Sequence, residues 1–370
     1  MDAFFASAEL LRLPQLRDQP VVIGGARRNA VAAREDFARL RDYAGRGVVT
    51  TATYAAREYG VRSGMGLMQA ARLCPDAILL PADFEEYRRC SRLFKGVVRA
   101  YAERVEDRGI DEVYFDLGAA AAAAGVDART MAGRIQRSIR DSTGLTCSIG
   151  IAPNKLLAKL ASEMDKPNGI TVVEAADLEA RIWPLACRKL NGIGPKSAQR
   201  LEALGIHKLG DLARHDRDAL LARFGRSYGA WLHEAAWGRH RSELVTESEP
   251  VSMSRETTFE RDLHAVRDRA ELGRIFTALC TQLAGDLQRK GYRGRNIGIK
   301  LRFDDFSTVT RAATLPAHID SAIAIRRAAG HCLRRAPLGR RLRLLGVRVG
   351  ALRRNQQLAH EESGSLELFG

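Results

Sequence analysis

The stretch "EDRGIDEVYFDL", residues 106–117, places carboxylates beside a strand-forming segment. Its "VYF" favours a β-strand, and the "RG" before it is typical of a turn. Asp111 and Glu112 would point to opposite faces of a regular strand. A turn or bulge would let the two side chains converge on one ion, and such hard oxygen ligands suit Mg²⁺. A solvated acidic surface, which would include Asp116, is the alternative interpretation.

The segments around this stretch alternate between helical and extended patterns. Apolar spacing predicts helices over 84–105 and 127–141, and "LTCSIGIA" (145–152) reads as a strand. "PNKLLAKLASEMDKPNG" (153–169) then reads as a helix that stops at Pro-Asn-Gly. The alanine-rich run at 119–125 is predicted to be a loop or the start of a helix. This half of the chain is therefore expected to form a mixed α/β layer.

The second half of the chain contains a helical region, a polar linker and a region rich in strands. Short helices with glycine turns are predicted between 183 and 240, and the polar stretch 239–250 suits a linker. Strands are predicted within 251–259, 295–315 and 343–352, with helices over 265–290 and 317–335 and a polar tail at the end. The expected fold class is α+β with several domains.

The charge of the chain indicates a polyanionic partner. The 370 residues include 59 Lys and Arg against 44 Asp and Glu, a net charge of +15, which favours nucleic acid over a merely basic surface. The six cysteines are scattered and form no CxxC pair, which argues against structural zinc and against a disulfide framework. The start has no basic segment leading into an apolar run, and no apolar run approaches the roughly 20 residues of a membrane span. A cytoplasmic protein without a membrane anchor is expected.

The stretch "LNGIGPKSAQRLEALGIHKLGDL", residues 190–212, resembles a helix-hairpin-helix. Gly192 and Gly194 would permit a tight turn whose backbone N–H groups approach a phosphate, and Lys196 would add a positive charge. Contacts of this kind hold a duplex without reading its sequence. The alternative is a glycine-rich helical turn with no role in binding.

Several motifs occur together in one order along nearly the whole chain. "MDAFFASAE", "GVVTTATYAAREYGVRSGM", "EDRGIDEVYFDL", "SIGIAPNKLLAKLASEMDKPNGITVV" and "LNGIGPK" together resemble the DinB-type Y-family DNA polymerases. The resemblance implies a right hand that copies damaged templates without proofreading. The implied divisions are palm (1–2 and 84–173), fingers (3–83), thumb (174–238), linker (239–250), little finger (251–352) and a flexible tail (353–370).

The resemblance also implies roles for single residues. Asp111 and Glu112 would bind two Mg²⁺ ions, with Glu112 as the catalytic residue and Asp2 as a secondary acid. Phe5 would be the steric gate that excludes a 2′-hydroxyl, whereas Phe4 would belong to the core. The residues that would hold the incoming triphosphate are Thr51, Tyr54, Arg57 and Lys166.

The partners implied are primer–template DNA, a dNTP and the sliding clamp, with the polymerase itself a monomer. The tail "SLELF" (365–369) resembles the clamp-docking motif of the family, with Ser365 where glutamine is usual. Leu366, Leu368 and Phe369 would still anchor in an apolar pocket.

Two departures from the family pattern leave alternatives open. Residues 26–44 form an insertion in the fingers. The family usually has a strand, ending in Val-Asp, that would precede Met1, and the aspartate is a metal ligand. Without that strand and aspartate, the alternative is a catalytically impaired or inactive protein that binds DNA and the clamp. A helix-hairpin-helix nuclease or glycosylase fits poorly, because the triphosphate-binding residues would have no task.

Overall fold

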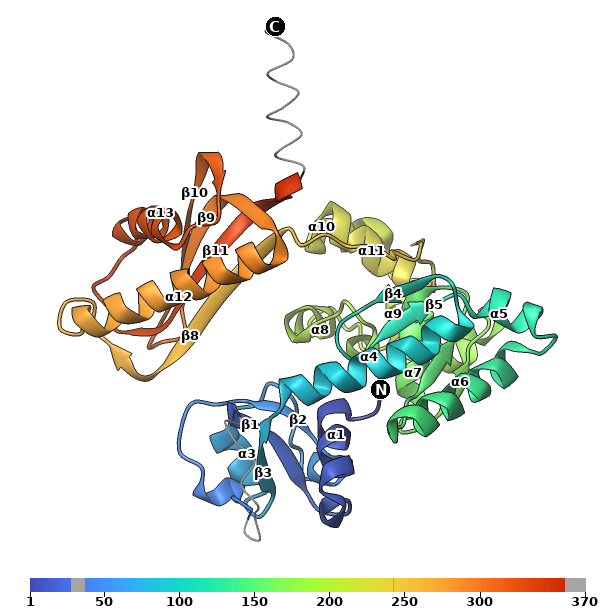
Figure 1. The fold of residues 1–370 in the computed structure, drawn as a ribbon. Helices are drawn as coiled ribbons and strands as arrows, with labels where there is room; N and C mark the ends of the chain where they lie inside the picture. Colours follow the sequence, from blue (N-terminus) through green and yellow to red (C-terminus); the bar gives the residue numbers. More distant parts are fainter. Residues whose placement is uncertain (28–36, 242, 357–370) are drawn as a thin grey trace, which may run out of the picture. The chain divides into compact units, whose positions relative to one another are not determined.

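The computed structural model describes residues 1–27, 37–241 and 243–356 (Figure 1). The chain divides into two compact units, Met1–Glu247 and Ser248–Gly370. Among the described residues, no helix is both long enough and apolar enough to cross a membrane. The predicted insertion at 26–44 lies partly outside the described residues, which resume at Phe37.

The first unit begins with a three-stranded sheet in the order β2-β1-β3. The central strand β1 pairs antiparallel with β2 and parallel with β3. The elements of this region are α1 (Phe4–Arg12), β1 (Val21–Arg27), β2 (Val49–Ala52), α2 (Tyr54–Glu58), α3 (Leu67–Leu73) and β3 (Ile78–Ala82), with short 3-10 turns at Pro14–Leu16 and Leu40–Asp42.

Helix α4 (Phe84–Tyr101) connects this sheet region to the next one (Figure 1). It begins at Asp83, whose side chain accepts the N–H of Glu86, the usual cap of a helix start. Tyr87 packs with the core of the first sheet, whereas Phe94 packs with the core beyond it. The helix predicted to reach residue 105 ends at Tyr101, because the chain turns extended to pair β4 with β5.

The acidic stretch lies in a region built from two separate two-stranded sheets. β4 pairs antiparallel with β5, and β6 pairs parallel with β7. The strand predicted over 145–152 is limited to Ile149–Ile151, because only these residues find a partner in β7. The elements are β4 (Val105–Asp107), β5 (Val113–Phe115), α5 (Leu117–Ala123), α6 (Ala128–Thr143), β6 (Ile149–Ile151), α7 (Lys155–Met164) and β7 (Ile170–Val172).

Gly150 allows α7 to pack directly on β6. A methyl group at Gly150 would lie 2.0 Å from the carbonyl oxygen of Ala158 and 2.4 Å from the amide nitrogen of Ser162. Both atoms belong to the helix backbone, so the whole helix would have to move. We therefore expect Gly150→Ala to lower the free energy of unfolding by about 3 kcal/mol, as overpacking does. Denaturation in urea, followed by circular dichroism, measures the change.

Gly133→Ala is the matched control for this prediction. The new methyl group in α6 would lie 3.6 Å from a side-chain nitrogen of Arg137, an ordinary contact. Replacing a glycine inside a helix is expected to leave the stability unchanged or to raise it by up to about 1 kcal/mol. A Gly150→Ala protein that unfolds at the same urea concentration as the unmodified chain would contradict the close packing of α7 on β6.

The first unit ends in a helical region with its own core. The helices α8 (Pro195–Glu202), α9 (Leu209–Arg214), α10 (Arg217–Phe224) and α11 (Arg226–Ala236) follow short turns at Ala175–Asp177, Leu178–Ile182 and Cys187–Lys189. Their apolar side chains, among them Leu201, Leu209 and Leu232, are fully buried together.

The second unit is a four-stranded antiparallel sheet in the order β10-β9-β11-β8. Leu283 of α12 and Ile325 of α13 are buried with Ile297 and Leu301 of β9, so both helices contribute to one core with the sheet. The elements are β8 (Ser252–Leu263), α12 (Arg269–Lys290), β9 (Tyr292–Phe303), β10 (Thr308–Ile319), α13 (Ala322–Arg334) and β11 (Leu342–Arg354). The predicted α+β fold class is confirmed.

Candidate active site

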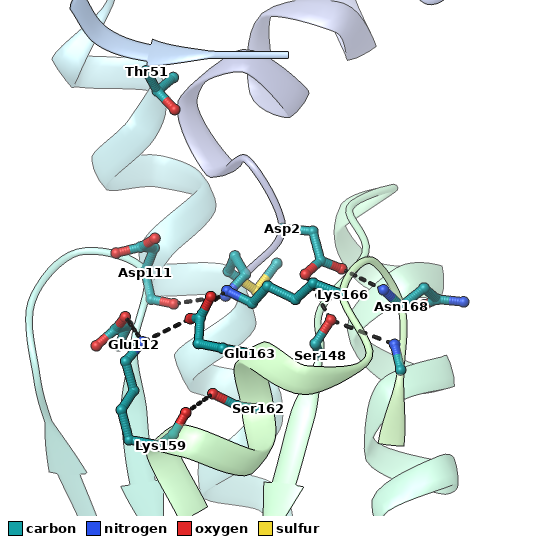
Figure 2. A network of polar contacts seen from close by, with 12 residues as sticks. Asp2, Thr51, Asp111, Glu112, Ser148, Lys159, Ser162, Glu163, Lys166 and Asn168 are labelled. Atoms are coloured by element: carbon teal, nitrogen blue, oxygen red, sulfur yellow. Dashed lines mark hydrogen bonds and ion pairs between the residues drawn. The ribbon is translucent and has the colours of Figure 1, made fainter. Parts of the chain in front are cut away.

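Asp111 and Glu112 lie in the turn between β4 and β5, before the strand begins. Gly109 adopts a φ of 115°, which favours glycine, and its carbonyl oxygen accepts a hydrogen bond from Lys95 at 2.7 Å. The amino group of Met1 donates to the carbonyl oxygen of Asp111 at 2.9 Å. Figure 2 shows the two carboxylates on the same side of the turn. Because both acids lie in the turn, they need not point to opposite faces as they would in a regular strand.

Helix α7 brings Lys159 and Glu163 to the acidic turn (Figure 2). Lys159 forms an ion pair with Glu112 and a second one with Glu163, at 3.0 Å from Nζ to Oε1. Glu163 also pairs with Lys166, which follows the helix, at 2.9 Å. Lys166 was expected from the sequence, whereas Lys159 and Glu163 were not. Their i,i+4 spacing on one helix face was the available signal.

Asp2 is buried, with 2% of its surface exposed, and its carboxylate already has two partners. One oxygen accepts from the hydroxyl of Ser148 at 2.7 Å, and the other accepts from the backbone N–H of Asn168 at 2.9 Å. In the described part of the chain, no group of three or more His, Cys, Asp or Glu residues could hold a metal ion. The role of Asp2 as a secondary metal ligand therefore stays a prediction, and in this structure its oxygens hold Ser148 and the turn after α7.

Thr51, Tyr54 and Arg57 are brought together at the end of β2 and the start of α2. Thr53 caps this helix by accepting the N–H of Ala56, and the three-residue spacing places Tyr54 and Arg57 on one face. The Arg57 guanidinium lies 4.9 Å from the centre of the Tyr54 ring and donates to the Thr51 hydroxyl at 3.4 Å. The three side chains therefore form a compact cluster of one guanidinium group and two hydroxyl groups.

The hydroxyl of Tyr54 is buried without a hydrogen-bond partner among the described residues. Burial raises the pKa of Tyr54, and the charge of Asp2 raises it further, whereas Arg57 lowers it and Glu163 raises it. The charges of Asp2 and Glu163 therefore both act on the Tyr54 hydroxyl. An unpaired buried hydroxyl is costly, and an oxygen-rich ligand would satisfy it.

Phe5 lies in α1 as part of an aromatic cluster. Its ring stacks on Tyr87 with centroids 4.3 Å apart and planes 18° apart, and it meets Phe84 edge-on. Tyr87 is held by a hydrogen bond from its hydroxyl to Glu9 at 2.8 Å. Phe4 is 4% exposed and belongs to the core, whereas Phe5 is only partly buried. Tyr87 therefore covers one face of the Phe5 ring, and the side chain remains partly accessible to solvent.

The glycine-rich turn before α8 has the geometry of a tight hairpin. Gly192 has a φ of 106°, and a methyl group there would lie 2.5 Å from the ring of Trp231. Gly194 precedes α8, and Lys196 is exposed in the first turn of that helix. Within the turn 190–194, Leu190 and Ile193 are buried, whereas Gly192 and Gly194 are exposed. The charged residue and the glycine backbone therefore remain available to a partner.

A cavity of about 590 Å³ adjoins the acidic turn. It is lined by β5 and β6 and by side chains of α4 and α6, and Asp111, Glu112, Lys159 and Lys166 also line it. A volume of this size lies in the usual range for a small-molecule site. The predicted clamp residues, Leu366, Leu368 and Phe369, lie outside the described residues.

Sequence families match three parts of the chain. The impB/mucB/samB family matches residues 1–163, the motif known as the IMS family HHH motif matches residues 175–206, and the C-terminal domain of the impB/mucB/samB family matches residues 250–363. The second match contains the glycine-rich turn before α8.

Curated relatives match over almost the full length. A protein named DNA polymerase IV from Methanoculleus marisnigri is 38% identical over 95% of this chain and 92% of its own length. Another protein of that name, from Halorhodospira halophila, is 37% identical over 96% of this chain and 95% of its own length.

Solved structures agree with the fold. The "Y-family DNA polymerase chimera Dbh-Dpo4(243-245)-Dbh" matches with a TM-score of 0.78 at 24% identity, covering 94% of this chain and 96% of its own. The "Insertion ternary complex of Dbh DNA polymerase" matches with a TM-score of 0.63 at 24% identity, covering 95% and 96%.

Proposed function

This chain belongs to the DinB-type Y family of DNA polymerases, and we propose that it adds nucleotides to a primer at the turn carrying Asp111 and Glu112. It is a DNA-directed DNA polymerase of the translesion type with a right-hand fold and a little finger. The sequence alternative of an inactive DNA- and clamp-binding protein finds no support in relatives that are named as polymerases.

One observation carries the assignment of the site. The unpartnered hydroxyl belongs to Tyr54, whose ring lies beside Arg57, and the charge of Glu163 acts on this hydroxyl. Glu163 in turn is linked through Lys159 to Glu112 of the acidic turn and pairs directly with Lys166. Phosphoryl transfer needs carboxylates that hold a metal ion. It also needs hydroxyl and cationic groups that bind the phosphates.

The residues present fit Mg²⁺ that is shared with a substrate. Mg²⁺ is usually held by one or two carboxylates together with waters and substrate phosphates, so a third protein acid is not required. Asp111 and Glu112 would supply those carboxylates, and two ions is the number that the family resemblance implies. A bound Mg²⁺ would neutralise charge on the phosphates.

The protein's own groups then bind and orient the reactants. Arg57 and Lys166 would pair with phosphate oxygens, and the Tyr54 and Thr51 hydroxyls would donate hydrogen bonds to them. The primer 3′-hydroxyl would attack the α-phosphate in line, and pyrophosphate would leave. The Phe5 ring, backed by Tyr87, would lie under the sugar and leave no room for a 2′-hydroxyl.

Two further contacts are part of the proposal. The turn at Gly192 and Gly194, with the exposed Lys196, would hold the DNA backbone, which is consistent with the family motif that matches this segment. The tail residues Leu366, Leu368 and Phe369 would dock on the sliding clamp, a proposal that rests on the sequence motif alone.

Primer extension with the purified chain tests the proposed function. We expect dNTP incorporation on an undamaged template and opposite an abasic site when Mg²⁺ is present, and no detectable incorporation after chelation with EDTA. Adding Mg²⁺ back should restore extension, since only the phosphate-bridging cation was removed. Binding of the primer–template without incorporation at saturating Mg²⁺ would contradict the proposal and favour the non-catalytic alternative.

A further inference from the structure

Two lysines share a single carboxylate oxygen of Glu163 (Figure 2). Oε1 of Glu163 lies 3.0 Å from Nζ of Lys159 and 2.9 Å from Nζ of Lys166. Lys159 also forms an ion pair with Glu112 through the same ammonium group. The four side chains therefore form one continuous chain of charges, Glu112–Lys159–Glu163–Lys166, between the acidic turn and the turn after α7.

The environment keeps Lys159 and Glu163 ionised. The side chains of Lys159 and Lys166 are only 19% and 21% exposed. Burial would lower the pKa of Lys159, but the hydrogen bond to Glu112 and the charge of Glu163 raise it overall. Burial would likewise raise the pKa of Glu163, but Lys166 and then Lys159 hold it below its usual value. The lysine ends of these ion pairs are shielded from water, whereas the side chains of Glu112 and Glu163 are 39% and 45% exposed, so salt screens the pairs in part.

The two outer ion pairs of this series compete with ligands of the proposed reaction. The Glu112–Lys159 pair competes with the divalent cation, and the Glu163–Lys166 pair competes with the triphosphate. Lys159 contacts an oxygen of Glu112, the carboxylate assigned to a divalent cation. A divalent cation on that carboxylate would repel the ammonium group, because like charges at a few ångströms repel strongly. The remaining partner of Lys159 is Glu163, which already binds Lys166. Two ammonium groups on one oxygen also repel each other, so Lys166 would be loosened when Lys159 moves.

We propose that Glu163 is a positioning residue that withholds Lys166 from the triphosphate, and that a divalent cation at Glu112 leaves Lys159 with Glu163 as its single carboxylate partner and so weakens the Glu163–Lys166 pair. Cation binding at the acidic turn then releases the lysine that receives the nucleotide. By thermodynamic linkage, nucleotide binding to Lys166 must also favour the cation at Glu112. The inference rests on the proposed function, in particular on the roles of Glu112 and Lys166.

The test measures nucleotide binding without chemistry. The full chain is bound to a primer–template whose primer ends in a dideoxynucleotide, and the Kd of the correct dNTP is measured by fluorescence at limiting and at saturating Ca²⁺. We expect Glu163→Gln to tighten dNTP binding about fivefold at limiting Ca²⁺, the scale of one partly screened ion pair. At saturating Ca²⁺ the cation has already released Lys166, so the two proteins should agree within about twofold.

Two further variants serve as a control and as a test of Lys159. Glu58→Gln removes an exposed glutamate of α2 outside the ion-pair chain and should leave the Kd unchanged at both Ca²⁺ concentrations. Lys159→Met removes the ammonium group that competes with Lys166 for Glu163, so its Kd for the dNTP should stay above that of the unmodified chain even at saturating Ca²⁺. Both measurements are made on the same dideoxy-terminated complex.

The outcomes that overturn the inference differ from those that overturn the proposed function. If Glu163→Gln changes the Kd by the same factor at both Ca²⁺ concentrations, Glu163 acts only through its charge and the coupling is refuted. No change at either concentration refutes it as well. Lys166→Ala should weaken dNTP binding at saturating Ca²⁺. If it does not, the proposed triphosphate role of Lys166 fails and the inference falls with it.

Discussion

Replacing Glu112 with glutamine is expected to slow nucleotide incorporation by about 10³-fold, equivalent to about 4 kcal/mol of transition-state stabilisation. Glutamine keeps the size of the side chain but removes the charge that would hold Mg²⁺ against the triphosphate. It also removes one of the two carboxylate partners of Lys159, which would keep only Glu163. Single-turnover incorporation with saturating dNTP and Mg²⁺ measures the effect.

Asp116→Asn is the matched control for this prediction. Asp116 lies four residues further along the same segment, is exposed, and caps α5 by accepting the N–H of Gly118 at 3.0 Å. Losing the Asp116 carboxylate should change the incorporation rate by less than about twofold relative to the unmodified chain, because the substitution removes only the cap of α5. Binding of primer–template DNA should be unchanged in both variants, which shows that the fold is retained. Incorporation by Glu112→Gln within about tenfold of the unmodified chain would exclude Glu112 as the catalytic carboxylate.

Replacing Phe5 with alanine is expected to raise ribonucleotide incorporation about 10²-fold relative to deoxyribonucleotide incorporation, a change of roughly 3 kcal/mol in discrimination. The Phe5 ring is stacked on Tyr87, and the hydroxyl of Tyr87 is tied to Glu9, so the ring cannot retreat from a 2′-hydroxyl. Removing the ring opens the space that the hydroxyl needs. The ratio of kcat/KM for a dNTP and for the rNTP of the same base measures the change.

Phe4→Leu separates sugar selection from a general disturbance of α1. Phe4 is buried and packs edge-on against Phe94 at 6.4 Å, so its truncation should reduce stability without changing the sugar ratio. The ratio should therefore respond to position 5 alone. An unchanged sugar ratio in Phe5→Ala would show that another group excludes the 2′-hydroxyl.

The site elements that depend on local sequence could be predicted. The glycine at 109 signalled the turn that places Asp111 and Glu112 outside the strand, and the structure has that turn. Tyr54 and Arg57 were assigned by the family resemblance, and their three-residue spacing places them on one face of α2 in the structure. Such features follow from backbone geometry within a few residues, so no distant contact is needed to establish them.

The end of a strand or helix was less predictable, because it depends on a partner elsewhere in the chain. Helix α4 was expected to reach residue 105, but the chain leaves the helix at Tyr101 to pair β4 with β5. The strand expected over 145–152 shrinks to the three residues that pair with β7. In both cases strand pairing overrides local propensity.

The sequence by itself determined the family, the fold class and the residue types at the acidic turn, because long motifs and local spacing carry that information. Only the tertiary structure decided which charges meet. Lys159 lies 47 residues from Glu112, and Asp2 lies 146 residues from Ser148, so no local pattern links either pair. Packing of α7 on β6, which Gly150 permits, places Lys159 and Glu163 on the acids. Because such packing brings together charges that are far apart in the sequence, the polar network of this site exists only in the folded chain.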